Sequence, residues 1–132
     1  MISPAVKLNL EPVPERTPEE VSRLVEAQLS LFENPSHAAH LKTFLIAPQR
    51  QMYTWDWEKP PRKFPVWIIA RGREYPKYSL LYSDYGFGPT SPWGLGMEPD
   101  EFFGADYSWY AGLETAYLES FLSEDSIIDR RS

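Results

Sequence analysis

His37 and His40 are the only histidines of this chain, and they stand three residues apart. On a helix they share a face, where two imidazoles can begin a metal site if a carboxylate arrives from elsewhere in the fold. The helical motif of zinc proteases has its histidines four residues apart, and the chain lacks it. Structural or surface roles are the favoured prediction for both, and we predict no metal and no cofactor.

Two glycines at Gly86 and Gly88 have the spacing found in nucleotide-binding loops. The third glycine of that fingerprint is missing, Pro92 interrupts the segment, and no long helix follows to offer its N-terminus to a phosphate. Turn formation is the favoured role, with glycine supplying positive φ. No serine stands in a nucleophile-elbow context, and the absence of cysteine excludes disulfides and thiolate chemistry.

Neighbouring carboxylates, such as Asp100 with Glu101 or Asp84 with Asp106, are residue types that perform acid–base and glycosidic chemistry. Carboxylates in polar loops are usually solvated, and sequence neighbours rarely converge on one substrate atom. We therefore predict that the chain is not an enzyme. The alternative is a small-molecule or carbohydrate-binding domain, with or without catalysis, whose aromatic-lined pocket lies near Tyr85, Trp93 and Trp109.

Charge is distributed unevenly along the chain. Residues 78–129 hold ten carboxylates and no lysine, arginine or histidine, while the remaining nine acids share the other residues with all thirteen Lys and Arg. The net charge of −6 is therefore a property of the C-terminal half. Such a field attracts cationic partners and repels nucleic acid and anionic membrane, so we expect a cationic protein partner, no nucleic acid and no membrane.

The segment from Glu98 to Tyr110 combines five aromatic residues with four carboxylates. Protein interfaces set aromatic anchors inside a polar rim, where charge steers the encounter and buried rings prolong the complex. A core role for the rings, with acids that only increase solubility, is the other interpretation. The predicted partner-binding residues are Asp84, Trp93, Glu98, Asp100, Glu101, Asp106, Tyr107 and Trp109.

The order of elements predicts an α+β fold in a single domain, residues 1–132, with an extended lead-in over 1–16 and a frayed tail over 123–132. Thr17-Pro18-Glu19-Glu20 carries the residues of a capping box and begins a first helix, and a second helix is expected at about 36–44. Leu31 is expected on the inner face of the first helix, and Pro48 closes the second. Three antiparallel strands follow at 52–57, 66–70 and 78–82, with a short fourth at 93–97. A C-terminal helix from residue 109 or 111 to 122 packs on one sheet face, as do the other helices. The predicted core includes Trp55, Trp67, Leu81 and Phe121.

Two segments, Leu80 to Pro89 and Pro92 to Leu95, resemble small bacterial immunity proteins that neutralise secreted polymorphic or type VI effector toxins. Trp109-Tyr110, leading into Leu113-Glu114 and Ala116-Tyr117, is similar to the helix that ends such chains. The resemblance covers roughly residues 50–122 and transfers no contact residue. It implies a non-enzymatic inhibitor that binds a cognate toxin domain in the cytoplasm of the producing cell, and the acidic half of the chain would suit a basic toxin domain. The lack of a secretory signal pattern and of a membrane span in the sequence favours the same location.

Overall fold

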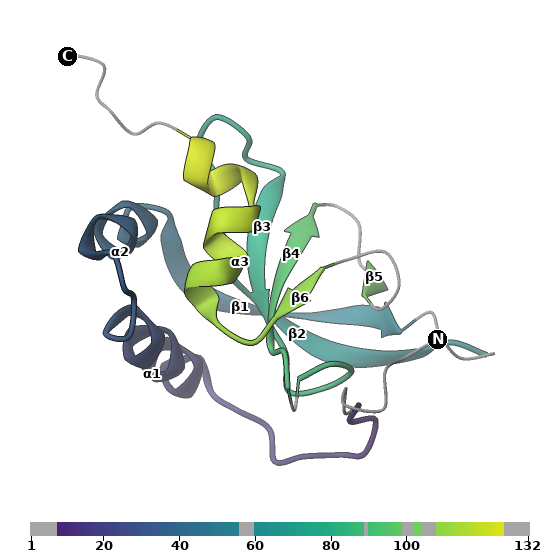
Figure 1. Ribbon diagram of the computed structural model, residues 1–132. Coiled ribbons are helices and arrows are strands. Elements are labelled where there is room, and N and C mark those ends of the chain that lie inside the picture. Colours follow the sequence, from purple (N-terminus) through teal and green to yellow (C-terminus); the bar gives the residue numbers. More distant parts are fainter. Residues whose placement is uncertain (1–7, 56–59, 89, 99–101, 104–107, 126–132) are drawn as a thin grey trace.

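The structure of the protein is a computed structural model that describes residues 8–55, 60–88, 90–98, 102–103 and 108–125. Two helices come first, a sheet follows, and a short helix and a 3-10 turn come last (Figure 1). In chain order the elements are α1 (Pro18–Leu29), α2 (Pro35–Lys42), β1 (Leu45–Trp55), β2 (Arg62–Arg71), β3 (Tyr78–Tyr82), β4 (Trp93–Met97), β5 (Phe102–Phe103), β6 (Trp109–Tyr110), α3 (Leu113–Glu119) and the 3-10 helix η1 (Phe121–Glu124). The predicted α+β class is confirmed.

The strands form one sheet in the order β5-β1-β2-β3-β4-β6. β1, β2, β3, β4 and β6 pair antiparallel, and the two-residue β5 runs parallel to β1. The prediction of three or four strands is therefore wrong, because Trp109 and Tyr110 pair with β4 and do not begin the last helix. The strands at 78–82 and 93–97 agree with the prediction.

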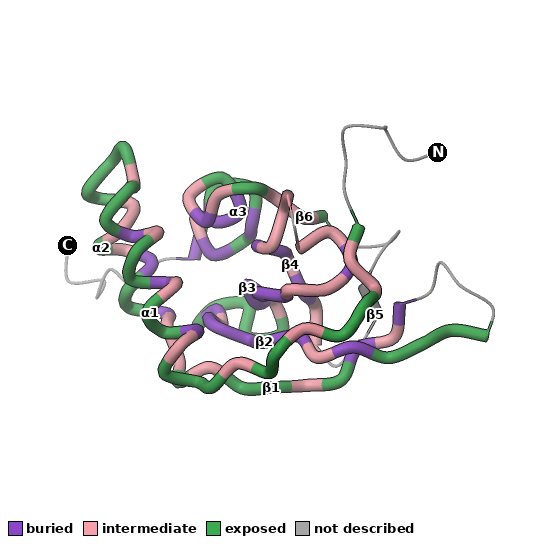
Figure 2. The backbone as a smooth tube through the Cα atoms, turned by 90° about the horizontal axis from the view of Figure 1, so that it is seen from below, coloured by how far each residue is buried: buried purple, intermediate pink, exposed green. Residues whose placement is uncertain are grey.

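Each face of the sheet carries its own hydrophobic cluster, because side chains alternate along a strand. On the helical face, Trp67, Leu80 and Tyr82 pack with the buried residues of the three helices. The opposite face holds a smaller cluster, to which Leu10 and the 85–87 loop contribute. Figure 2 shows the buried parts of β2, β3 and β4 lying beneath α3.

The helices were predicted to pack on one sheet face, but not all of them lie on the sheet. α1 packs on β1 and against α3, and α3 packs over β4 and β6. α2 packs mainly against α3 and η1, so it forms a flank of the helical layer (Figure 1). Within the described residues, no helix has the length and apolar character needed to cross a bilayer.

The capping box that the sequence predicts is formed at the start of α1. The Thr17 hydroxyl accepts from the Glu20 amide at 3.1 Å, and the Glu20 carboxylate accepts from the Thr17 amide at 2.8 Å. The helix ends at Leu29, so Leu31, which was predicted on the inner face, is 71% exposed. Leu29 is buried in its place.

The strand β1 begins at Leu45, seven residues before the predicted strand at 52–57. Pro48 was expected to close a helix, but it lies within β1 where the register with β2 shifts. Proline is tolerated at bulges and on strands near a sheet edge, and β1 has only the two-residue β5 beyond it. The position of β1 near the sheet edge therefore allows Pro48 to lie within a strand, where the sequence had predicted the end of a helix.

Trp55, Trp67 and Leu81 are buried as predicted, whereas Phe121 is 45% exposed and that prediction is wrong. The cause is Ser120, whose extended backbone interrupts the helical period between α3 and η1. Its hydroxyl accepts from the Leu122 amide and begins the 3-10 turn. Leu122 is consequently buried, and Phe121 turns outward.

Candidate functional site

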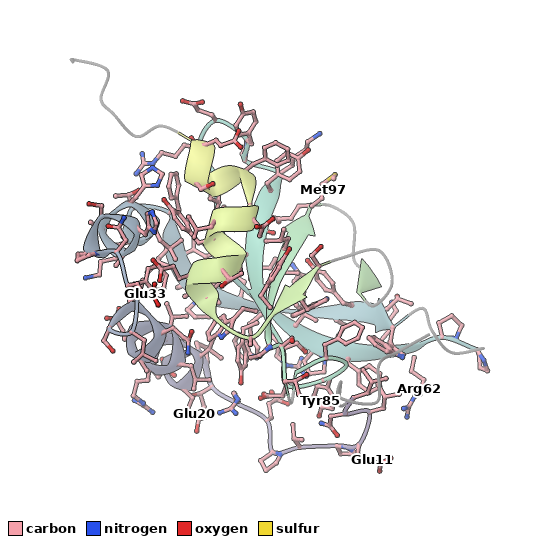
Figure 3. The ribbon with its side chains drawn as sticks, viewed as in Figure 1. Glu11, Glu20, Glu33, Arg62, Tyr85 and Met97 are labelled. Carbon is pink, nitrogen blue, oxygen red and sulfur yellow. The ribbon has the colours of Figure 1, made fainter. Side chains whose placement is uncertain are left out.

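The two described carboxylates of the predicted acidic surface, Asp84 and Glu98, do not lie together. Among its described members, Asp84 follows the Tyr82 end of β3, while Glu98 follows Met97, which pairs with Tyr78 at the other end. Figure 3 shows the two ends through Met97 and Tyr85, which lie on opposite sides of the molecule. Asp100, Glu101, Asp106 and Tyr107 lie outside the described residues, so their contribution stays a prediction.

The Asp84 carboxylate is held by two side chains, those of Arg16 and Tyr82. Its two carboxylate oxygens accept from Arg16 at 2.7 and 3.0 Å, and the Tyr82 hydroxyl donates to it at 2.7 Å. A two-point guanidinium–carboxylate pair is among the stronger polar contacts in proteins. Burial and the bond to Asp84 raise the pKa of Tyr82, and the bond to Asp84 raises the pKa of Arg16.

The same contacts fasten the N-terminal segment, residues 8–16, across the end of β3. Asn9 and Gly86 exchange backbone hydrogen bonds at 2.8 Å, and the Val13 amide donates to the Tyr85 hydroxyl at 3.0 Å. Gly86 has φ of 62°, a conformation that glycine adopts without strain. This glycine therefore serves a structural turn, as the sequence predicted.

Glu98 is likewise paired across the sheet. Arg71 on β2 donates to both of its carboxylate oxygens, at 2.6 and 2.9 Å, and also to the Gln49 side chain. The hydrogen bond to Glu98 raises the pKa of Arg71. Glu98 thus ties the end of β4 to the end of β2, and its charge is locally balanced.

The two histidines join α2 to the C-terminal elements. The His37 Nδ1 lies 2.9 Å from the Glu114 carboxylate, which also accepts from the Glu33 and Asn34 amides. The His40 Nε2 donates to the Asp125 carbonyl oxygen at 2.9 Å, so in the neutral ring Nδ1 accepts from the Tyr117 hydroxyl. In the part of the chain that the structure describes, no three His, Asp or Glu side chains are grouped to hold a metal ion.

Asp125 is fully buried beneath the turn that joins β2 to β3. Its Oδ2 accepts from the backbone amides of Arg73 and Glu74, the latter at 2.7 Å. Backbone amides that converge in a turn form an anion-binding concavity, and here the chain supplies its own anion. A fourth acid of the C-terminal half therefore serves the fold.

The predicted aromatic pocket near Tyr85, Trp93 and Trp109 is not formed. Trp93 is 2% exposed and packs in the helical cluster, with its ring 4.9 Å from that of Tyr82. Tyr85 and Trp109 belong to the cluster on the opposite face. Trp109 covers Gly94, where any side chain would collide with its ring. Trp93 is thus a core residue, and it is not available for partner contact.

An exposed aromatic surface lies elsewhere, at the Tyr78 end of β3. The ring of Phe121 is 4.5 Å from that of Tyr78 and 5.5 Å from that of Tyr75. Tyr75 is 39% exposed and Leu118 47%. Beside these rings is a hollow of about 210 Å³, which we call the aromatic hollow. Its lining includes Tyr78, Leu95, Met97, Glu119, Ser120 and Phe121.

The aromatic hollow carries one carboxylate among its lining residues, that of Glu119. Glu119 is exposed, and none of the described cations lies within salt-bridge distance of it. Two basic residues of the turn between β2 and β3 contact other groups: Lys77 lies 5.5 Å over the Tyr78 ring, and Arg73 donates to the Thr43 carbonyl. The sequence interpretation missed this surface, which the capping signal of Ser120 could have revealed.

A second hollow, of about 310 Å³, lies beside Asp84 and is lined by residues 13–16, Glu20 and Gly88. Its carboxylates already have partners within the chain: Asp84 binds Arg16, Glu20 caps α1 and Glu15 lies 3.5 Å from Arg50. The arrangement therefore serves to hold the N-terminal segment in place.

No protein-family model matches this chain, and comparison with curated proteins and with solved structures gives no significant match. The resemblance of residues 50–122 to immunity proteins therefore stays a prediction.

Proposed function

We propose that this chain is a non-enzymatic binding protein of the immunity type, which recognises a basic partner, such as a toxin domain, and neutralises it. The observation that carries the proposal is the exposed aromatic surface around Phe121, with the Glu119 carboxylate beside it, which has no ion-pair partner among the described residues. Exposed apolar patches with polar surroundings are typical of protein interaction sites.

The composition of this surface favours a protein partner over a small molecule. Tyrosine, phenylalanine and methionine are enriched in protein interfaces, and all three line the aromatic hollow. Its 210 Å³ falls below the range of about 300–1,000 Å³ that small-molecule sites occupy. A volume of this size suits one inserted side chain.

The charge of the chain favours a cationic partner. The net charge of −6 attracts basic surfaces at long range, and the described acids that remain unpaired include Glu119 and Glu124 on the C-terminal elements. The resemblance to immunity proteins implies a toxin domain as the partner, and the acidic half of this chain suits a basic one. The toxin domain would use the same positive surface to bind nucleic acid, and this chain would cover that surface.

The proposal is tested by capture of the partner from the source lysate on immobilised protein, followed by co-expression of the two in a sensitive host. We expect a captured protein whose basic domain stops growth alone and permits growth in the presence of this chain. Stopped-flow association should slow as salt rises toward physiological strength, where the Debye length is about 8 Å. An association rate indifferent to salt, or growth arrest that co-expression does not relieve, contradicts the proposal.

A further inference from the structure

We propose that the aromatic hollow is the seat of an arginine side chain of the basic partner, with its guanidinium against the ring of Phe121 and paired with the Glu119 carboxylate. This inference rests on the proposed function and names the chemistry of its contact. Its three elements are the shape of the hollow, the rings that border it and the Glu119 carboxylate, to which no described cation is paired.

The shape of the hollow fits a long side chain with a polar end. Leu95 and Met97 form apolar parts of the lining, and Glu119, which is exposed, lines the hollow as well. Ser79 and Gly96 are partners across β3 and β4. Because side chains alternate along a strand, the Ser79 hydroxyl points to the same face as Leu81, away from the helical face of the sheet. The hollow therefore offers an apolar lining and a charged rim, which suits a methylene stem with a cationic head.

Among the described residues, four aromatic rings each have a cation over them. Arg16 lies over Tyr82, Arg62 over Phe64, Arg73 over Phe44 and Lys77 over Tyr78, at 5.0–5.8 Å from the ring centroid. A cation over an aromatic face is attracted by the quadrupole of the ring. Phe121 is more exposed than the other two rings of its cluster, and none of these four cations lies over it.

Arginine fits this site better than lysine. Its planar guanidinium stacks on a ring and at the same time donates two parallel hydrogen bonds to a carboxylate. The pair of Arg16 with Asp84 beside the Tyr82 ring shows the same combination within the chain. Glu119 supplies the carboxylate at the aromatic hollow, where the chain itself provides no arginine among the described residues.

The test is a titration of the ¹⁵N-labelled protein with hexa-arginine, hexa-lysine and hexa-citrulline peptides, followed by NMR. We expect hexa-arginine to shift the amide signals of residues 95–97 and 118–121 most, and hexa-citrulline to bind least. Glu119→Gln should raise the dissociation constant for hexa-arginine about threefold to tenfold, the size expected for a partly exposed ion pair combined with a cation–π contact. Phe121→Leu should weaken binding and reduce the preference for arginine over lysine.

The matched control is Glu124→Gln, which removes the same charge from an exposed position of η1 that does not line the hollow. Equal weakening by Glu119→Gln and Glu124→Gln, equal binding of the arginine and lysine peptides, or shifts confined to other residues would each overturn the assignment. The proposed function fails separately. A captured partner that binds Glu119→Gln and Phe121→Leu as tightly as the wild type leaves the proposed function standing and overturns the arginine site. Growth arrest that co-expression does not relieve, together with arginine-selective binding in the hollow, leaves the arginine site standing and overturns the proposed function.

Discussion

The two ends of β3 use the same kinds of residue for different purposes. At the Tyr82 end, the carboxylate of Asp84 is bound by Arg16 and Tyr82, and the N-terminal segment is fastened over it. At the Tyr78 end, rings are exposed and the carboxylate of Glu119 lacks an ion-pair partner among the described residues. We call these the closed end and the open end. The comparison teaches that an acidic residue in this chain is informative about binding only after its internal partners are known.

The largest effect is expected from the core beside the closed end. Trp93→Ala should lower the free energy of unfolding by about 3–5 kcal/mol, because it leaves a cavity against Tyr82 in the helical cluster. Urea denaturation followed by circular dichroism measures it. Trp93 was predicted to touch the partner. If Trp93→Ala folds with unchanged stability and loses only binding, Trp93 is a partner-contact residue, and the distinction between the closed end and the open end fails.

The turn between β2 and β3 should be the next most sensitive feature. Asp125→Ala removes the acceptor of the Arg73 and Glu74 amides, and loss of hydrogen bonds to a buried charged group costs about 1.5–3 kcal/mol. Hydrogen exchange of those two amides should accelerate together with the loss in stability. Glu124→Gln, one residue earlier and exposed, is the control and should stay within about 0.5 kcal/mol of the wild type. Unchanged exchange at residues 73 and 74 would refute the assigned role of Asp125.

A pH dependence is expected where α2 meets α3. Hydrogen bonds from the Glu33 amide, the His37 ring and the Asn34 amide lower the pKa of Glu114 from its ordinary value of 4.5. A carboxyl whose pKa is lower in the folded state stabilises the fold above the unfolded-state pKa. That contribution disappears as pH falls through the folded-state value. Thermal unfolding should therefore show a stability loss below about pH 4.5 that is smaller in Glu114→Gln. Parallel pH profiles of the two proteins would contradict the assignment.

Local signals in the sequence were sufficient for several elements. The capping box at Thr17 and Glu20 fixed the start of α1, and the alternating or apolar runs at 78–82 and 93–97 fixed two strands, because each signal depends on a few adjacent residues. The outward turn of Phe121 was missed, since one serine cap outweighed the helical period on both sides of it.

The candidate site was less predictable than the fold. Asp84 and Arg16 are 68 residues apart, and Glu114 and His37 are 77 apart, so their pairing depends on the tertiary arrangement. The acidic half was therefore interpreted as a surface for a partner, while Asp84, Glu98, Glu114 and Asp125 are bound within the chain. The aromatic hollow is formed by β3, β4, α3 and η1 together, and no single segment carries its pattern.

The most direct test of the open and closed ends is the association of the captured partner with two single variants, Glu119→Gln and Asp84→Asn, measured by stopped flow at low salt. Both changes remove one negative charge, so their effect on the long-range field is the same. We expect Glu119→Gln to weaken the complex about threefold to tenfold with wild-type stability. Asp84→Asn should destabilise the fold by about 1–2 kcal/mol. Once folded, it should show only the small loss of association rate that comes from the missing charge, which both variants share. Stronger loss of binding in Asp84→Asn than in Glu119→Gln would contradict the account.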